Sequence, residues 1–347
     1  MSTSTLPEGQ KLAGISPRAF EHPADRAATA ALGRIPLLNT VVAKLIELGY
    51  VNAMRQNLRA GAIKLGPTQL GNAWADHSAA YARLDMDPVP NLYVTQFPMV
   101  NAMAVGAGKP LVVVNSATVE LLDREELRAV LAHEAGHILA EHVTYQSALA
   151  VLLSLGGGPL GALGSLPLKG IQLALMEWYR AAELSADRAA ALVVRDPLVV
   201  CRLLMVVSAG VPSERLDLAA FIEQGRQYRD AEGWNRLSRL RTELNQTHPY
   251  AVKRVHELMK WVQSGEYDRI IGGEYVKRGN EAHWREETDA ATEHYTERFR
   301  GMMDDAAQGV SKLGEQVGEA TGKASEAASE AAEKLQGWLR RDRDQQG

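Results

Sequence analysis

The sequence has very little cysteine, since Cys201 is the only one in 347 residues. One thiol cannot form an internal disulfide, so no such cross-link can stabilise the fold. Cys201 lies in an apolar stretch with Val199, Val200, Leu203 and Leu204. This setting predicts a small buried hydrophobic side chain and not a catalytic nucleophile.

The sequence also lacks an excess of positive charge and an apolar amino-terminal segment. Its formal net charge is −4 and its pI is about 6.2, which gives no electrostatic footprint for nucleic acid. The first residues, Met-Ser-Thr-Ser-Thr-Leu-Pro-Glu-Gly-Gln-Lys, have no signal-peptide core, so we expect a cytoplasmic protein. Hydrophobic residues make up 46% of the chain, enough for one large domain or two ordinary ones.

What the sequence does contain is the motif His133-Glu134-Ala135-Gly136-His137. On a helix, residues four apart share one face, so both imidazoles can reach one ion while Glu134 addresses a water beside it. Asp123 is predicted to cap this helix with Glu126 as its capping-box partner. The alternative is two surface or core histidines that fall at this spacing by chance.

A catalytic zinc site needs a third protein ligand and one open position. His142 does not fit the extended zinc motif, which places its last histidine six residues after the second, and we expect it to be exposed near the helix end. Glu183 is the better candidate, and Asp187, on the same helical face, would hold a ligating imidazole. The alternative is a solvated helix face with Arg180 and Arg188 as ion-pair partners.

These motifs, followed by an E-x-x-x-D segment at Glu183 and Asp187, resemble the zinc metallopeptidase family of the HtpX heat-shock proteases and the CAAX prenyl endopeptidases. Two flanking segments strengthen the resemblance, which covers about residues 90 to 260. Asn101-Ala102-Met103-Ala104-Val105-Gly106 is similar to the family's edge strand, and Thr247-His248-Pro249 with Arg254 is similar to its H-P-x-x-x-x-R segment.

The resemblance implies a mostly helical α+β fold of zincin type, with a small sheet whose edge strand lines the cleft. The composition from Gly301 onward adds a low-complexity C-terminal tail. It also implies one Zn²⁺ per chain, held by His133, His137 and Glu183. The substrate would lie along the edge strand at Asn101, Ala102 and Ala104.

The same residues predict a mechanism, in which a zinc-activated water attacks the peptide bond and Glu134 is the general base. His248 is a candidate donor to the oxyanion, or else a residue at a helix start before Pro249. Arg254 would lie near the zinc-binding carboxylate, or else on the surface.

Along the chain, helical periodicity runs from Pro23 to about Met54 with a break near Gly33 to Pro36, and again from about Pro67 to Leu84. Strands are expected at residues 91–95, 101–105 and 111–114, followed by helices to about Trp261. We therefore expect four parts. They are an N-terminal helical region (1–66), the zinc metallopeptidase domain (67–270), a helical linker (271–300) and an Ala/Glu-rich tail (301–347).

Two segments leave alternatives open. Residues 143–168 contain no Asp, Glu, Lys or Arg but are divided by Gly156, Gly157, Gly158 and Pro159. They predict two helices that pack over the cleft or touch a membrane surface, with true insertion or plain core as alternatives. The tail carries a thin alanine stripe, which indicates a solvated tail or a marginal helix that orders on a partner or lipid.

Two functions from different classes follow from the sequence. The first is a zinc endopeptidase acting on a protein or peptide substrate, with a possible peripheral membrane contact through residues 143–176 or the tail. The second is a protein-binding, holdase-like module that keeps the edge strand but hydrolyses little. The sequence gives no indication of the oligomeric state.

Overall fold

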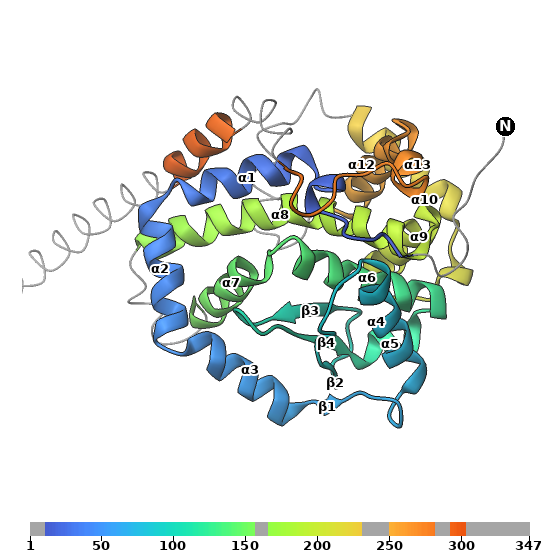
Figure 1. Ribbon diagram of the computed structural model, residues 1–347, viewed down its shortest axis with the longest axis horizontal. Coiled ribbons are helices and arrows are strands. Elements are labelled where there is room, and N and C mark those ends of the chain that lie inside the picture. The colour runs from blue at the N-terminus through green and yellow to red at the C-terminus, as the bar shows by residue number, and fades with distance from the viewer. Residues whose placement is uncertain (1–10, 157–165, 231–249, 282–291, 303–347) are drawn as a thin grey trace, which may run out of the picture.

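A computed structural model describes residues 11–156, 166–230, 250–281 and 292–302 of the chain (Figure 1). Helices predominate, around one small sheet. The longer helices are α1 (Pro23–Gly33), α2 (Pro36–Glu47), α3 (Tyr50–Gly61), α4 (Gly71–Arg83), α6 (Arg124–Leu139), α7 (Val143–Gly156), α8 (Leu166–Val194), α9 (Pro197–Ala209), α10 (Leu218–Asp230) and α12 (Ala251–Gln263). The short helices are η1 (Pro17–Ala19), α5 (Ser116–Leu121), η3 (Ser213–Arg215) and α13 (Glu266–Ile271).

The sheet has the strand order β1-β2-β4-β3, from β1 (Ile63–Lys64), β2 (Leu92–Thr95), β3 (Ala102–Val105) and β4 (Leu111–Asn115). β2 and β4 are parallel, and the other two pairings are antiparallel. Alternate residues of β4 face opposite sides: Val112 and Val114 join the main core, whereas Leu111 and Val113 pack toward α3. The three predicted strands are confirmed, and β3 lies at the edge of the sheet.

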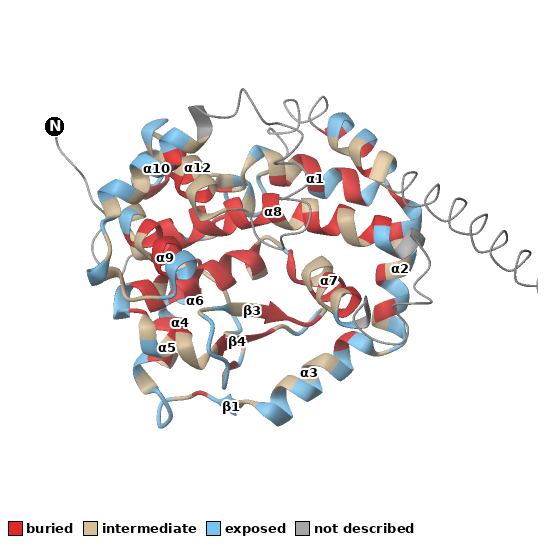
Figure 2. Cartoon of the chain, turned by 180° about the vertical axis from the view of Figure 1, so that it is seen from behind, coloured by how far each residue is buried: buried red, intermediate tan, exposed pale blue. Residues whose placement is uncertain are grey.

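The centre of the molecule is the crossing of α6 and α8, both of which are largely buried (Figure 2). Small residues allow the two helices to approach closely. A Cβ atom added at Gly136 of α6 would lie 2.6 Å from the Cβ atom of Ala189 in α8. Because no side chain separates the backbones here, polar groups of one helix can reach polar groups of the other.

Helix α6 begins and ends in recognisable motifs. The predicted capping box is confirmed, since Asp123 accepts a hydrogen bond from the Glu126 amide and Glu126 accepts one from the Asp123 amide. At the other end, Glu141 has a left-handed φ of 59°, and the His142 amide donates back to the His137 carbonyl at 3.0 Å. This is a Schellman ending, which turns the chain back beneath the last turn of the helix.

A second core joins the N-terminal helices to α7 and α8. The predicted break between α1 and α2 is confirmed, with α1 ending at Gly33 and α2 beginning at Pro36. The apolar residues of α7 are used in this core, whose members there include Ala148, Leu149, Val151 and Leu152. A helix over residues 292–302 also joins it and places Phe299, which is fully buried, against the same cluster.

Among the described residues, no single helix is long and apolar enough to cross a membrane. The pair α1 and α2 passes the length and composition test when taken together, but the two helices are bent by 84°. Residues 157–165, in the middle of the charge-free segment, lie outside the described part of the chain. The predicted tail lies outside it from residue 303 onward.

Candidate functional site

His133 and His137 face Glu183 across the crossing of α6 and α8. The Nε2 atoms of the two imidazoles are 3.1 Å apart, and Oε1 of Glu183 lies 3.2 Å from Nε2 of His137 and 3.6 Å from Nε2 of His133. All three side chains are buried. The helical spacing thus places both imidazoles on one face of α6, as the sequence predicts, and in the structure this face meets α8.

The three ligand atoms fit a zinc ion. Ligands about 2.0–2.1 Å from one zinc in tetrahedral geometry lie roughly 3.3 Å from each other, close to the three separations observed here. Two imidazole nitrogens and one carboxylate oxygen also form a donor set that catalytic zinc uses, with the fourth position open. Within the described ranges, His133, His137 and Glu183 are the cluster that could hold a metal ion.

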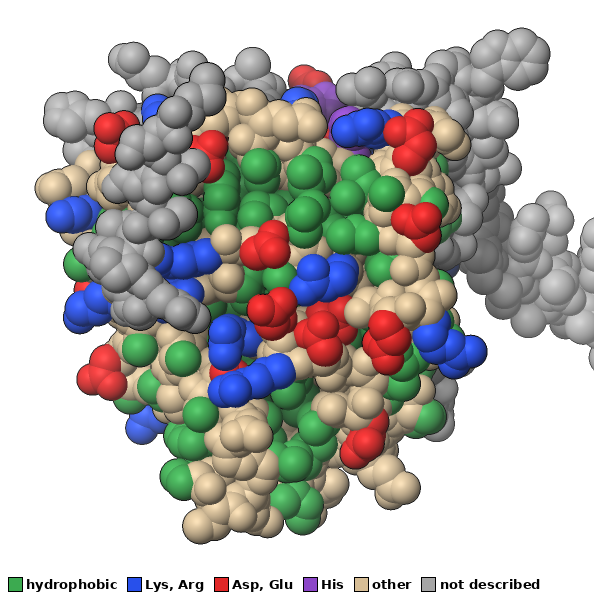
Figure 3. Space-filling model, turned by 90° about the vertical axis from the view of Figure 1, so that its right-hand side faces the viewer, with side chains coloured by type: hydrophobic (Ala, Val, Ile, Leu, Met, Phe, Trp, Pro, Cys, Tyr) green, Lys and Arg blue, Asp and Glu red, His purple; other side chains and the backbone are tan. Residues whose placement is uncertain are grey.

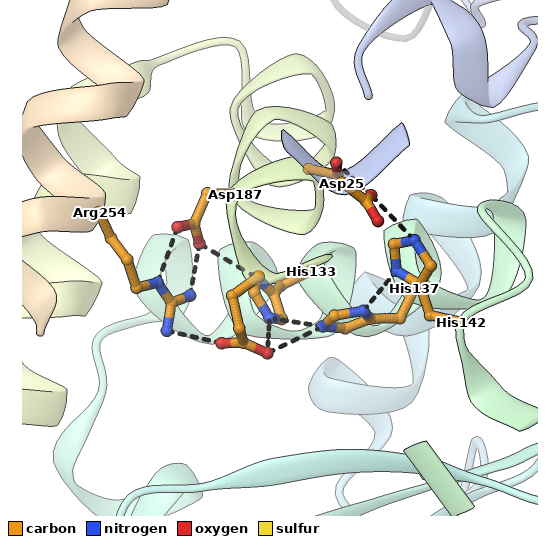
Figure 4. Close-up of polar contacts among 8 residues, drawn as sticks. Asp25, His133, His137, His142, Asp187 and Arg254 are labelled. Carbon is orange, nitrogen blue, oxygen red and sulfur yellow. Dashed lines mark hydrogen bonds and ion pairs between the residues drawn. The ribbon is translucent and has the colours of Figure 1, made fainter. Parts of the chain in front are cut away.

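Asp187 and Arg254 support these residues from one side (Figure 4). Nδ1 of His133 lies 3.1 Å from Oδ1 of Asp187, so its ring N–H can be donated there while Nε2 faces the ligand cluster. Arg254 donates to both oxygens of Asp187, at 2.8 and 2.6 Å, and pairs with Oε2 of Glu183 at 2.8 Å. One guanidinium therefore balances two buried carboxylates.

The pKa values of the two imidazoles are shifted in opposite directions. For His137, burial is the largest influence and lowers the pKa to about 3. For His133, burial also lowers the pKa, but the carboxylates of Glu183 and Asp187 outweigh it and raise the value to about 10. The carboxylates of Glu183 and Asp187 thus place negative charge beside His133, which suits a bound cation.

Glu134 projects beside the ligand atoms and keeps one oxygen without a partner. Its side chain is 4% exposed, and Oε2 is buried without a hydrogen bond. Burial raises the pKa of Glu134 to about 7, and the neighbouring His133 lowers it only in part. An orphaned carboxylate oxygen at this position is suited to accept a proton from a water or from a substrate group.

Two cavities meet at Glu134 and Tyr179. One, of about 410 Å³, is also lined by His133, Glu183 and Arg254. The other, of about 140 Å³, is mostly apolar and extends toward Leu149 and Leu153 of α7. Asn101 and Ala102 line both cavities, and Ala104 lines the smaller one. Edge strand β3 therefore runs along the wall of a cleft that contains the ligand cluster.

His142 is not exposed, so that prediction was wrong. It is 2% exposed, with Nδ1 2.9 Å from Nδ1 of His137 and Nε2 3.0 Å from Oδ2 of Asp25 in α1. The Schellman turn at Glu141 brings it back beneath the helix. From the sequence we assigned no role to Asp25, which pairs with His142, or to Tyr179. The ring of Tyr179 stacks on that of His137. A non-glycine residue in left-handed conformation is difficult to predict from sequence.

The sequence also supports predictions for His248, Cys201 and two arginines. His248 lies outside the described residues, so its role stays a prediction. Cys201 is fully buried in the main core, and burial raises its pKa to about 12, as expected for a hydrophobic side chain. Arg180 pairs with Glu177, and the guanidinium of Arg188 lies over the ring of Trp261.

Comparison with known proteins identifies related peptidases. The family model of Peptidase family M48 matches residues 72–262. The plastoglobule-localized metallopeptidase 48 of Arabidopsis thaliana chloroplasts is 35% identical over 260 residues, which are 73% of this chain and 74% of that protein. A protease HtpX homolog of Ralstonia pickettii is 26% identical over 206 residues, 52% of this chain and 70% of its own length. No solved structure is significantly similar to this chain.

Proposed function

The chain belongs to peptidase family M48, and from this premise we propose that it is a zinc-dependent endopeptidase in which Glu134 is the general base. As a member of this family it is a peptide hydrolase, and its substrates are proteins or peptides. One observation carries the finer proposal. The unpartnered oxygen of Glu134 lies in the cleft that also holds the ligand atoms of His133 and Glu183 and the edge strand β3.

His133, His137 and Glu183 would hold the metal, one ion per chain. When bound, a zinc ion polarises a substrate carbonyl and makes a water more acidic. Asp187 keeps the Nε2 lone pair of His133 turned toward the ligand cluster by accepting its Nδ1 proton. Arg254 holds Glu183 through its other oxygen, Oε2, so that Oε1 remains directed at the imidazoles.

Glu134 would move the protons of the reaction. It accepts a proton from the attacking water as the water oxygen bonds to the peptide carbon, and it then delivers that proton to the leaving amine as the C–N bond breaks. No covalent enzyme intermediate is needed. β3 would align the substrate, since Ala102 and Ala104 lie on the cleft wall and an extended peptide can pair with an edge strand. His248 is the proposed donor to the oxyanion.

The test is the Glu134→Gln variant. Glutamine has the shape of glutamate but cannot take the proton, so we expect the variant to fold and to bind one zinc per chain. Cleavage of an unfolded protein should fall by several orders of magnitude, toward the level of chelator-treated wild type. Full cleavage by the variant would contradict the general-base role. Absence of zinc from the purified wild type would contradict the proposed zinc site.

The Glu134→Gln variant also distinguishes the peptidase function from the holdase-like protein-binding function. If it suppresses aggregation of an unfolded client as well as wild type does, binding is independent of hydrolysis. If the wild type shows suppression but no chelator-sensitive cleavage, the protein-binding function is the correct one.

For location, we propose the cytoplasm, with a peripheral membrane contact through residues 143–176 or the tail. The support for the membrane contact is the absence of Asp, Glu, Lys and Arg from residues 143–168. Flotation with phospholipid vesicles tests the contact. Recovery of the chain with the vesicles is expected, and recovery only in the protein fraction would contradict it.

A further inference from the structure

His137 is supported on the side away from its metal-facing nitrogen by two residues that the metal cluster does not include. His142 follows the Schellman turn of α6, and Asp25 lies in the first turn of α1 (Figure 4). Nδ1 of His137 and Nδ1 of His142 are 2.9 Å apart, and Nε2 of His142 is 3.0 Å from Oδ2 of Asp25. The three groups form a continuous line of hydrogen bonds that ends on a carboxylate.

Asp25 is itself fixed on every side. It is 1% exposed, and Oδ1 accepts a hydrogen bond from the hydroxyl of Thr29 at 3.2 Å. Oδ2 also accepts one from the hydroxyl of Ser185 at 2.5 Å. Ser185 lies on α8 between the two carboxylates of the E-x-x-x-D segment and accepts a hydrogen bond from the His22 amide at 2.8 Å. The start of α1 is therefore attached to α8 directly behind the metal cluster.

The positions of the protons follow from this geometry. Between the two Nδ1 atoms there is room for one proton only. If His137 binds a metal through Nε2, its ring proton must be on Nδ1, where it is donated to Nδ1 of His142. The proton of His142 is then on Nε2 and is donated to Asp25. The opposite arrangement would leave an N–H of His137 directed at the metal cluster and would prevent binding.

We propose that His142 and Asp25 are positioning residues that hold His137 in the tautomer and ring orientation required for metal binding. This inference rests on the metal site of the proposed function. The cluster is then supported from both sides: Asp187 orients His133 directly, whereas Asp25 orients His137 through an intervening imidazole. Asp25 also precedes residues 72–262, which match the family model, so the N-terminal helix contributes to the peptidase site.

Two substitutions at position 142 separate orientation from packing. His142→Phe keeps a ring of similar size but removes the acceptor for His137 and the donor for Asp25. His142→Gln is smaller but keeps one of each, since its Oε1 can accept and its Nε2 can donate. Zinc affinity is measured by competition with a chromophoric chelator. We expect His142→Phe to bind about 10- to 100-fold more weakly, and His142→Gln to stay closer to wild type.

A matched control comes from a second buried histidine. His77 is fully buried, its ring contacts Tyr81 and Trp74, and its Nε2 pairs with the Pro90 carbonyl and not with another histidine. His77→Phe also replaces a buried imidazole by a phenyl ring, so it reports what such a change does to folding alone. We expect its zinc affinity to remain that of wild type. If His142→Phe does not fold, Asp25→Asn is measured instead, and about tenfold weaker binding is expected.

Nitrogen NMR of the zinc-loaded protein gives a readout that a packing role would not change. In wild type we expect His137 to be a single tautomer with its proton on Nδ1, and in His142→Phe we expect that signal to shift or to split. Unchanged zinc affinity and an unchanged His137 signal in His142→Phe would overturn the proposal. If wild type itself binds no zinc, the metal site of the proposed function fails, and this inference fails with it.

Discussion

At the scale of single residues, the site depends on buried charges that compensate one another. Arg254 contacts Glu183 and Asp187, and all three side chains are at most 8% exposed. Burial alone would lower the pKa of Arg254, but the two carboxylates outweigh it and raise the value. Without Arg254, the carboxylates of Glu183 and Asp187 would be buried without this positive charge. Buried carboxylates without a counter-charge strongly destabilise the folded state.

Arg254→Leu should therefore destabilise the protein strongly. Removal of one partner from a buried ionic cluster costs about 3–5 kcal/mol. The control is Arg34→Leu, whose pair with Glu293 at 3.2 Å is half exposed and should contribute about 0–1 kcal/mol. Urea unfolding of the metal-free proteins measures both. Equal, small losses in the two variants would contradict the role of Arg254 as the balancing charge.

A second prediction at this scale concerns pH. Burial lowers the pKa of His77 to about 4, well below its ordinary value of 6.5, although a hydrogen bond to the Pro90 carbonyl at 2.9 Å opposes the shift. The folded state binds the proton less readily than the unfolded state. The contribution of His77 is therefore complete above pH 6.5 and is lost as the pH falls from 6.5 toward 4, by up to about 3 kcal/mol.

Comparison with His77→Gln isolates this effect, because the other histidines titrate in both proteins. The free energy of unfolding should fall more steeply in wild type than in the variant between pH 7 and pH 5. Parallel curves would show that His77 becomes protonated in the folded state as easily as in the unfolded chain.

At the scale of elements, the decisive feature is the close crossing of α6 and α8. In the proposed metal site, His133 and His137 on α6 must meet Glu183 on α8, and side-chain length limits the distance that can be bridged. The crossing is close because Gly136 has no side chain and faces Ala186 and Ala189. Gly136, the residue directly before His137, therefore sets the separation of the two helices.

Gly136→Ala adds only a methyl group and alters no polar side chain, yet it should impair the site. Its Cβ atom would lie 2.6 Å from Cβ of Ala189, so the helices must separate, and overpacking of this kind costs about 1–3 kcal/mol. We expect weaker zinc binding together with lower stability. Gly33→Ala is the control, because nothing lies within 4 Å of its added Cβ atom. If both variants bind zinc like wild type, the close approach does not determine the ligand geometry.

At the scale of the whole molecule, distant parts of the chain build one structure. Helix α1 packs along α8, and the helix over residues 292–302 returns to the same second core. The surface contributes less to stability. On the side shown in Figure 3, a band of hydrophobic side chains lies above a belt in which acidic and basic side chains alternate. An exposed ion pair such as that of Arg34 with Glu293 contributes about 0–1 kcal/mol.

Two truncations test where the folded part ends. A chain that stops after residue 302 keeps Phe299 and Met302, which pack against the second core, and should retain its unfolding transition, zinc content and peptidase activity. A chain that stops after residue 291 loses Phe299, which is fully buried, and should be less stable by at least about 1.5–3 kcal/mol. Thermal and urea unfolding measure the difference. Equal stability of the two chains would contradict the role of this helix.

The sequence by itself determined the features that depend on local geometry. The helical period places His133 and His137 on one face whatever the rest of the chain does, and the capping box at Asp123 uses neighbours three residues apart. The strands could be located because runs of β-branched residues between turn residues favour strand over helix. The family could be recognised because its ordered motifs are short and specific. The domain boundaries and the role of His248 stay predictions.

Only the tertiary structure decided what lies behind the ligands. Asp25 and Phe299 reach the site and the second core from segments far apart in the sequence, and no local pattern encodes such contacts. The prediction of an exposed His142 was wrong because position in the sequence suggested a helix end facing solvent. The left-handed turn at Glu141 and the packing of α1 against α8 bury that imidazole beside His137. Burial depends on which elements pack together, and that depends on the whole chain.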